Sequence, residues 1–341
     1  MRGLSRTVKF SVSTDELPMK QIFIPVLSLV TCAAAADLEV PEGTYVQAEK
    51  AGVDYVIQGE YLGKLSAGEE SAVFGLQVIA LGNHEFDAVA YIGGLPGAGA
   101  NMERKIPAKG KTEDGVTTLV ASTGTAVIKD GVCEILDKDG NSVGKLRKTV
   151  RKSPTLGRKA PEGATVLFNG QSADRFARGK VVLKDLLLAD CETKEKFGSH
   201  KMHLEFRTPF KPKARGQGRG NSGVYIQSRY ECQVLDSFGL EGKNNECGGI
   251  YSIAEPAVNA CFPPLTWQTY DIDYTAPEWK DGKKVRNARV TIHHNGILIH
   301  DNIELPHGTP GKHPEVEGPD GLYLQGHGNP VVYRNIWVVE K

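Results

Sequence analysis

The chain has 341 residues, enough for one large domain or for two domains of ordinary size. Its 41 Lys and Arg residues balance its 41 Asp and Glu residues, so no net charge attracts it to nucleic acid or to an anionic membrane. The 39 Gly and 18 Pro residues favour short strands joined by tight turns. We therefore expect a fold dominated by β-strands, a small or neutral partner, and no nucleic acid.

The first predicted element is an export signal. Met19 and the basic residue after it precede an apolar run, residues 21–36, which ends in small residues typical of a cleavage site. The run is too short and too interrupted for a membrane span. We therefore expect residues 1–36 to be a signal region with its true start at Met19, no transmembrane span, and a periplasmic or secreted protein. Lipidation at Cys32 is the minority alternative.

Two predicted β-domains follow the signal region. Residues 37–148 contain short apolar segments that end at Gly or Asp-Gly turns, which predicts a small β-domain. Residues 149–163, TVRKSPTLGRKAPEG, are basic and contain prolines without an apolar period, which predicts an exposed linker. Residues 164–341 contain many further strands and no long helix. The predicted fold class is all-β, with a two-sheet sandwich or jelly roll after the small domain.

One motif raises the question of metal binding. Residues 82–87, GNHEFD, match a phrase of metallophosphoesterases, but the other ligands of such a two-metal site are missing, so we expect a hairpin turn.

The cysteines raise the question of a disulfide. Cys247 and Cys261 flank a Gly/Pro-rich segment and are either a disulfide or two buried thiols, because spacing alone does not show their geometry. We expect no cofactor and no metal site, although a hard cation on carboxylates and amides leaves no sequence signature.

Alternation along the later strands predicts sheets with one polar face. In the strand KMHLEFR, the apolar residues share one face, and Glu205 and Arg207 lie on the other. In the strand RYECQVLD, Glu231 and Gln233 share a face. Tyr323 shares a face with Gln325 in GLYLQGH. Such a face suits sugars, which need planar polar partners and aromatic rings, although an ordinary solvated face is the alternative.

A series of phrases in residues 165–340 resembles the 3-keto-disaccharide hydrolase family, which has a concanavalin A-like jelly-roll fold. The phrases occur in the order of the family and are VLFNG, FGSHKMHLEFR, RGNSGVYIQSRYECQVLDSFG, NNECGGIYSI, PPLTWQTYDIDY, HNGILIHD and LYLQGHGNPVVYRNIWV. The amino-terminal half resembles, less specifically, small β-domains of secreted planctomycete-type proteins. The ordered series makes the resemblance of the carboxyl-terminal half specific.

The resemblance implies a carbohydrate substrate. This substrate is a glycoside that carries a ketone at C3, because a partner enzyme, a glycoside 3-dehydrogenase, has already oxidised its C3 hydroxyl group. The ketone acidifies the C2 proton, so a base can remove it and the C1 leaving group can depart, after which water adds back. This chemistry needs one base, one acid and a group that stabilises an enolate.

The residues fit that scheme better than a retaining glycosidase, because the strand that would carry E-x-D-x-E has an amide at Gln233. The candidate acid or base residues, in order of preference, are Glu231, Asp236 and Glu205. Arg207 is the candidate enolate stabiliser. The candidate hydroxyl-binding residues are Asn221, Gln233, Gln325 and His327.

Two other functions fit the same sequence. A lectin-like carbohydrate-binding module would use the same fold without chemistry, since one sandwich hosts both functions. An envelope interaction protein would be favoured if the amino-terminal domain carried an exposed apolar patch. A closed arrangement of Glu231 with a second acid would favour the enzyme, and an open, flat polar face would favour the module.

Overall fold

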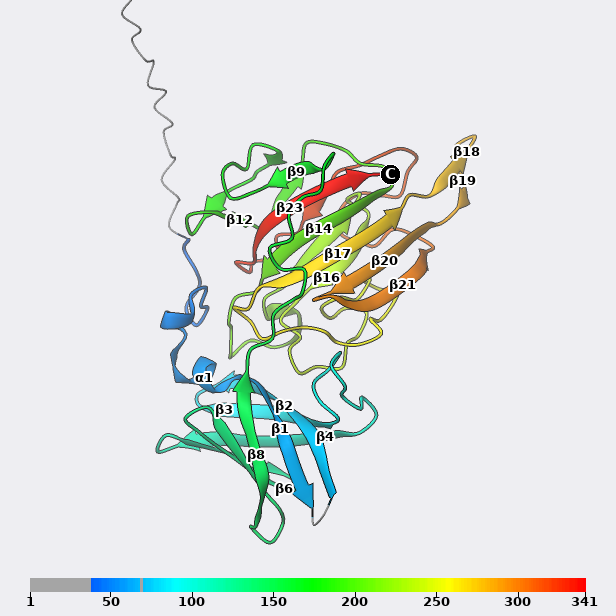
Figure 1. Cartoon of the computed structure of the whole chain (residues 1–341). Helices are drawn as coiled ribbons and strands as arrows, with labels where there is room; N and C mark the ends of the chain where they lie inside the picture. The colour runs from blue at the N-terminus through cyan, green and yellow to red at the C-terminus, as the bar shows by residue number, and fades with distance from the viewer. Residues whose placement is uncertain (1–37, 68–69) are drawn as a thin grey trace, which may run out of the picture. The chain divides into compact units, whose positions relative to one another are not determined.

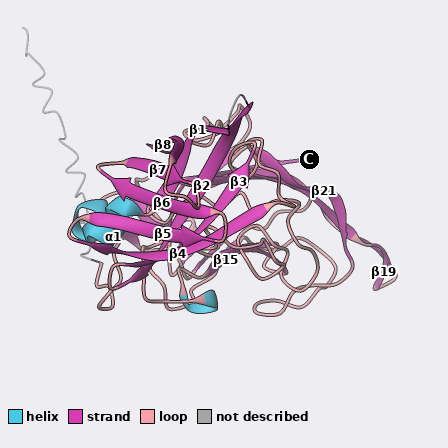
Figure 2. Cartoon of the chain, turned by 90° about the horizontal axis from the view of Figure 1, so that it is seen from below, coloured by secondary structure: helices cyan, strands magenta, loops and turns pink. Residues whose placement is uncertain are grey.

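The computed structural model describes residues 38–341 except residues 68–69. Strands dominate these residues, and helix is confined to short segments, Ala48–Lys50, Gly52–Ile57 (α1) and Gly216–Gly218 (Figure 2). Within the described part of the chain, no helix has both the length and the apolar character needed to cross a membrane. The predicted signal region and Cys32 lie outside the described residues.

The first eight strands form a closed antiparallel barrel, in which each strand pairs with the next and the eighth pairs with the first. The strands are β1 (Gly59–Ala67), β2 (Glu70–Gly82), β3 (Glu85–Ile92), β4 (Lys105–Glu113), β5 (Val116–Ala121), β6 (Gly124–Lys129), β7 (Val132–Leu136) and β8 (Ser142–Thr149). Asn83 and His84 join β2 to β3 with φ of 55° and 63°, values typical of the turns that two-residue hairpins use. The hairpin predicted at residues 82–87 is confirmed.

The remaining strands form a sandwich of two sheets. The five-stranded sheet has the order β10 (Phe176–Ala177), β13 (Cys191–Thr193), β22 (Tyr323–Leu324), β15 (Ser222–Ile226) and β16 (Tyr230–Val234). The eight-stranded sheet contains β11 (Val181–Val182), β12 (Leu186–Leu188), β23 (Val332–Glu340), β14 (His200–Arg207), β17 (Gln268–Thr275), β20 (Ala288–His294) and β21 (Ile297–Leu305), with β9 (Thr165–Phe168) paired to β23. The small hairpin β18 (Glu278–Lys280) and β19 (Lys283–Arg286) is separate. Figure 1 shows β23, β14, β17, β20 and β21 side by side. The predicted all-β jelly roll behind a small β-domain is confirmed.

The two sheets bury one shared core. Met202, Leu204 and Phe206 of β14 are buried in it, as are Val224 of β15 and Cys232 of β16. Because side chains alternate along a strand, the residues between these point away from the core. The outer face of one sheet therefore lies on the opposite side of the core from the outer face of the other.

Residues 149–163, predicted to be an exposed linker, are mostly exposed, and some of them contact the eight-stranded sheet. Ser153 is buried and shares a 2.6 Å hydrogen bond with Thr269 of β17. The Gly157 N–H donates a 2.6 Å hydrogen bond to Glu205 of β14. Local composition predicted the exposure of the segment but not these contacts, because it does not show which polar partners the sheet offers.

Cys247 and Cys261 are buried free thiols, the second of the two alternatives that the sequence left open.

Candidate functional site

A row of four residues crosses the outer face of the five-stranded sheet. The strand registers pair Glu231 with Tyr225, Tyr225 with Tyr323, and Tyr323 with Glu192. Paired residues of neighbouring strands point to the same face, so these four side chains share one surface. We call them the polar row. The polar row therefore consists of a carboxylate, two phenol rings and a second carboxylate, each from a different strand.

Glu231 is a buried carboxyl group without a cationic partner among the described residues. Its residue is 3% exposed, and the Tyr225 hydroxyl lies 2.9 Å from Oε2. Burial raises the pKa of Glu231 to about 7, although the hydrogen bond from Tyr225 opposes this increase. A Cβ atom at Gly223 would lie 2.3 Å from Oε1, so only glycine at that position leaves room for this carboxyl group. The carboxyl group can therefore change its charge near neutral pH.

The Tyr225 hydroxyl connects Glu231 to the segment that follows β21. It lies 2.9 Å from the Pro310 carbonyl oxygen as well as 2.9 Å from Glu231, and it accepts a 3.2 Å hydrogen bond from the Gln325 amide. One hydroxyl proton cannot serve both acceptors. When Glu231 is protonated, the carboxyl group can donate to Tyr225, and Tyr225 can donate to Pro310.

Three predicted substrate-binding residues lie beside Glu231. Gln233 is on the same face of β16 and donates a 2.8 Å hydrogen bond to the Asn221 side chain. Gln325 follows β22, and its backbone N–H donates to the Gly223 carbonyl oxygen at 2.8 Å. The structure therefore brings Glu231, Gln233, Asn221 and Gln325 together.

His327 is exposed and lies two residues beyond Gln325. Its neighbours Gly326 and Gly328 line a pocket of about 370 Å³, together with Asp190 and Asn329. The Tyr323 hydroxyl lies 3.4 Å from the Asp190 carboxylate. The pocket thus adjoins the polar row near Tyr323, and its volume is in the range of ligand-binding clefts.

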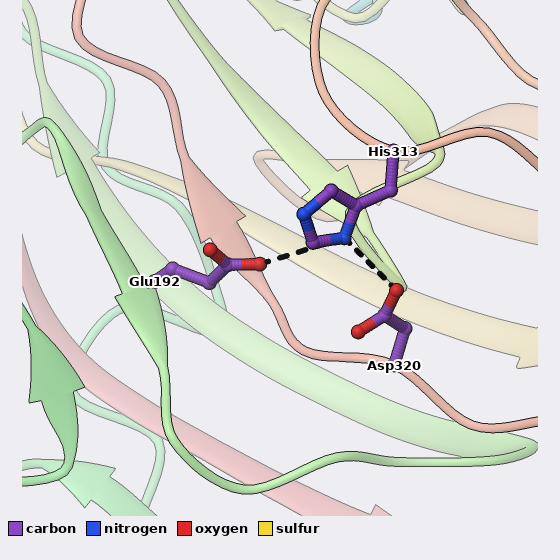
Figure 3. Close-up of side chains that lie close together, drawn as sticks. All are labelled: Glu192, His313 and Asp320. Carbon is purple, nitrogen blue, oxygen red and sulfur yellow. Dashed lines mark hydrogen bonds and ion pairs between the residues drawn. The ribbon is translucent and has the colours of Figure 1, made fainter.

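A second cluster lies at the Glu192 end of the polar row. Figure 3 shows the His313 ring between the carboxylates of Glu192 and Asp320, and its Nδ1 atom lies 3.8 Å and 3.0 Å from them. The three residues offer ligand atoms within 4.8 Å of one another, a mixed imidazole and carboxylate set that could hold a divalent cation. Lys312 lies 3.0 Å from Glu192, and Arg229 lies 3.6 Å from Asp320, so both carboxylates already have cationic partners.

Glu205 and Arg207 lie on the other side of the sandwich core from Glu231. The Arg334 guanidinium donates a 2.7 Å hydrogen bond to Glu205, and Asn335 donates another at 2.9 Å. Burial alone would raise the pKa of Glu205, but the His203 ring at 3.7 Å and hydrogen bonds from Asn335, Gly157 and Arg334 lower it to about 2. Arg207 lies over the Trp267 ring at 5.0 Å. The structure does not bring these two predicted residues together with Glu231.

Asp236 forms a buried ion pair. Its carboxylate accepts a 2.7 Å hydrogen bond from Arg219, and both side chains are almost fully buried. A second hydrogen bond reaches Asp236 from the backbone N–H of Phe238. Its carboxylate is therefore committed to a neighbouring cation, in contrast to that of Glu231.

The hydrogen bonds of Glu205 predict a stabilising role that can be measured. Its pKa of about 2 lies below the ordinary value of 4.5, so the folded state favours the ionised form. Glu205→Gln is expected to lower the free energy of unfolding by about 3 kcal/mol at pH 7. This stabilisation is complete above about pH 4.5 and is lost as the pH falls through about 2. Urea unfolding from pH 7 to pH 3 measures it.

Glu340→Gln, at an exposed position of β23, is the control for this measurement. A difference between wild type and Glu205→Gln that stays constant as the pH falls would contradict the assignment.

The sequence alone did not single out Tyr225, Glu192 or His313. In the strand SGVYIQS, Tyr225 is two residues after Gly223, so the two residues lie on the same face of the strand. This alternation is the sequence signal that could have indicated that Tyr225 shares a face with Glu231. Glu192 and His313 are 121 positions apart in the numbering, and no local pattern connects them.

Residues 163–339 match the family described as the 3-keto-alpha-glucoside-1,2-lyase-like domain. The matched segment covers more than half of the chain, and it contains the whole polar row. The chain belongs to this family. No curated protein sequence matches the chain.

Among solved structures, three candidate glycosyl hydrolases from Parabacteroides distasonis are similar to this member of the 3-keto-alpha-glucoside-1,2-lyase-like family. One is 32% identical, with coverage of 53% of this chain and 85% of the other, and a TM-score of 0.49. A second is 18% identical, with coverage of 53% and 94% and a TM-score of 0.40. The third is 19% identical, with coverage of 52% and 99% and a TM-score of 0.37.

Membership of the 3-keto-alpha-glucoside-1,2-lyase-like family gives the chain a glycoside-acting function.

Proposed function

We propose that the chain cleaves the glycosidic bond of 3-keto-glycosides by elimination across C1 and C2, followed by addition of water. The observation that carries this proposal is the buried Glu231 carboxyl group, which has no cationic partner in the described part of the chain and whose pKa burial raises to about 7. A general base works best when its pKa lies near the working pH. The family description, which names a 1,2-lyase, supports the same reaction.

In the proposed reaction, the Glu231 carboxylate removes the proton from C2 of the substrate. The electron pair of the C–H bond forms an enolate with the C3 ketone, and the bond between C1 and its oxygen then breaks. The departing oxygen takes up a proton, and water then adds its hydroxyl group to C1 and a proton to C2. The products are a free 3-keto sugar and the leaving alcohol, so the net reaction is hydrolysis.

The spacing of carboxylates in the polar row supports elimination rather than an ordinary glycosidase mechanism. Glu192, the other carboxylate of the row, is three strands from Glu231. Neighbouring strands lie about 4.8 Å apart, so the two backbones are about 14 Å apart. The paired carboxyl groups of glycosidases are about 5 to 9.5 Å apart. Tyr225 and Tyr323 lie between the two carboxylates. The Tyr225 hydroxyl already bonds to Glu231, Pro310 and Gln325, so the Tyr323 hydroxyl, next to Asp190 of the pocket, is the one that can bind a sugar.

The substrate class implies a partner reaction. A 3-keto-glycoside must be supplied by an enzyme that oxidises the C3 hydroxyl of a glycoside, because the proposed elimination starts from a ketone and does not itself oxidise the sugar.

The test is release of free sugar from 3-keto-trehalose and related 3-keto-glucosides, with the unoxidised disaccharides as controls. We expect release from the keto substrates only, because only the ketone makes the C2 proton acidic. Equal release from trehalose would indicate an ordinary glycosidase. Binding of the keto sugars without release would favour the lectin-like module.

A further inference from the structure

The barrel β1–β8 contains an apolar cavity that the site on the sandwich does not use. The cavity has a volume of about 330 Å³ and is lined by residues of all eight strands. Its aliphatic and aromatic lining includes Leu65, Phe74, Leu76, Ile106, Leu119 and Ile135. An eight-stranded barrel has an interior that is either filled by its own side chains or holds one small ligand.

The amino-acid sequence creates this cavity in one half of the barrel. In the other half, Tyr61, Val78, Phe86 and Ile128 fill the interior and are at most 3% exposed. Where the cavity lies, one inward position on each of four adjoining strands carries alanine. These residues are Ala90, Ala108, Ala121 and Ala126. Packed interiors contain few voids larger than a water molecule, so small residues beside a cavity of this size leave room for a ligand.

The rim of the cavity defines the head group of that ligand. Thr123, Thr125 and Asp137 are the polar residues of its lining. Thr125 is the cross-strand partner of Val120 and shares its outward face, so Thr123 supplies the hydroxyl group at the rim. The Asp137 carboxylate lies at the same rim and accepts hydrogen bonds from the backbone of Asp139 and Asn141. Among the described residues that line the cavity, none carries a positive charge that could pair with a carboxylate or phosphate head group. A neutral head group that carries hydroxyls fits this rim.

We propose that the barrel binds the alkyl chain of a neutral amphiphile, with its hydroxylated head group at the rim. Apolar cavities of about 150 Å³ hold benzene, so a cavity about twice as large takes a chain of about ten carbon atoms. The flexible aliphatic lining fits a single alkyl chain that enters end-on.

Titration calorimetry with decyl glucoside, below the concentration at which it forms micelles, tests the proposal on the full chain. We expect one molecule of decyl glucoside to bind per chain. Glucose should not bind at this site, and sodium decanoate should bind at least tenfold more weakly, because its charge lies next to Asp137.

Two matched variants of β5 locate the binding site. Ala121→Phe fills the cavity and should reduce the affinity for decyl glucoside at least tenfold. Val120→Phe, at the neighbouring outward position, which is 60% exposed, should bind as wild type does. Ala121→Leu provides a smaller filling substitution if the phenylalanine variant unfolds, as thermal unfolding would show.

Glu231→Gln should leave the binding of decyl glucoside unchanged, which separates this site from the polar row. No binding by the wild-type chain, or equal affinity of the Ala121 and Val120 variants, would overturn the proposal.

Discussion

Glu231→Gln is expected to lower the turnover of 3-keto-trehalose by about 10²- to 10⁴-fold, because it removes the proposed general base. In the wild-type enzyme, kcat/KM should rise with pH up to about 7, where the Glu231 carboxyl group becomes ionised. The residual activity of the variant should lack this dependence. Initial rates of sugar release between pH 5 and pH 9 measure both effects.

The same variant should gain stability at alkaline pH. Burial raises the pKa of Glu231 to about 7, above its ordinary value of 4.5, so the folded state disfavours the ionised form. Wild-type stability is therefore lost as the pH rises from about 4.5 through about 7. At pH 8 the glutamine variant should be more stable by about 3 kcal/mol, and at pH 4 the two should be alike. Urea unfolding at both values measures the difference.

Glu205→Gln is the control for catalysis, since it changes a buried carboxylate on the other side of the sandwich core. It should retain wild-type turnover under conditions where it is folded. Full turnover by Glu231→Gln, or a loss of turnover in Glu205→Gln without unfolding, would contradict the assignment of the site.

Asp236→Asn should reduce the free energy of unfolding by about 3 to 5 kcal/mol, because it leaves the Arg219 guanidinium buried without its carboxylate. The double variant Arg219→Met/Asp236→Leu should recover most of this loss, since a buried ion pair can be replaced by apolar side chains of similar volume. Urea unfolding of the two variants and of the wild-type chain measures these differences.

Turnover distinguishes this structural role from catalysis. Asp236→Asn should release sugar from 3-keto-trehalose at a rate close to wild type when it is assayed well below its unfolding temperature. An Asp236→Asn protein that is as stable as wild type but inactive would instead place Asp236 in the catalytic machinery.

The alternation of residues along single strands predicted which side chains share a face. Glu231 and Gln233 do share one face of β16, and Met202, Leu204 and Phe206 do face the core. This prediction succeeds because the side-chain period of a strand is two in any sheet. The family phrases likewise identified the fold, because they occur in order through the whole sandwich.

Only the tertiary structure distinguishes the three predicted acids. Each of them stands in a polar context in the sequence, but Arg334 lies 129 positions after Glu205, and Arg219 lies 17 before Asp236. Glu231 receives a tyrosine hydroxyl instead of a cation. A pKa depends on the groups that folding brings within hydrogen-bonding distance, which local sequence does not specify.

The sequence by itself determined the all-β class and the faces of the strands, because composition, turns and alternation act over a few residues. The ordered family phrases indicated the jelly roll and the family. The tertiary structure decided that some of residues 149–163 contact the sheet, that the polar row runs from Glu231 to Glu192, and that the barrel contains a cavity. These features depend on strand order and register, which join residues far apart in the chain.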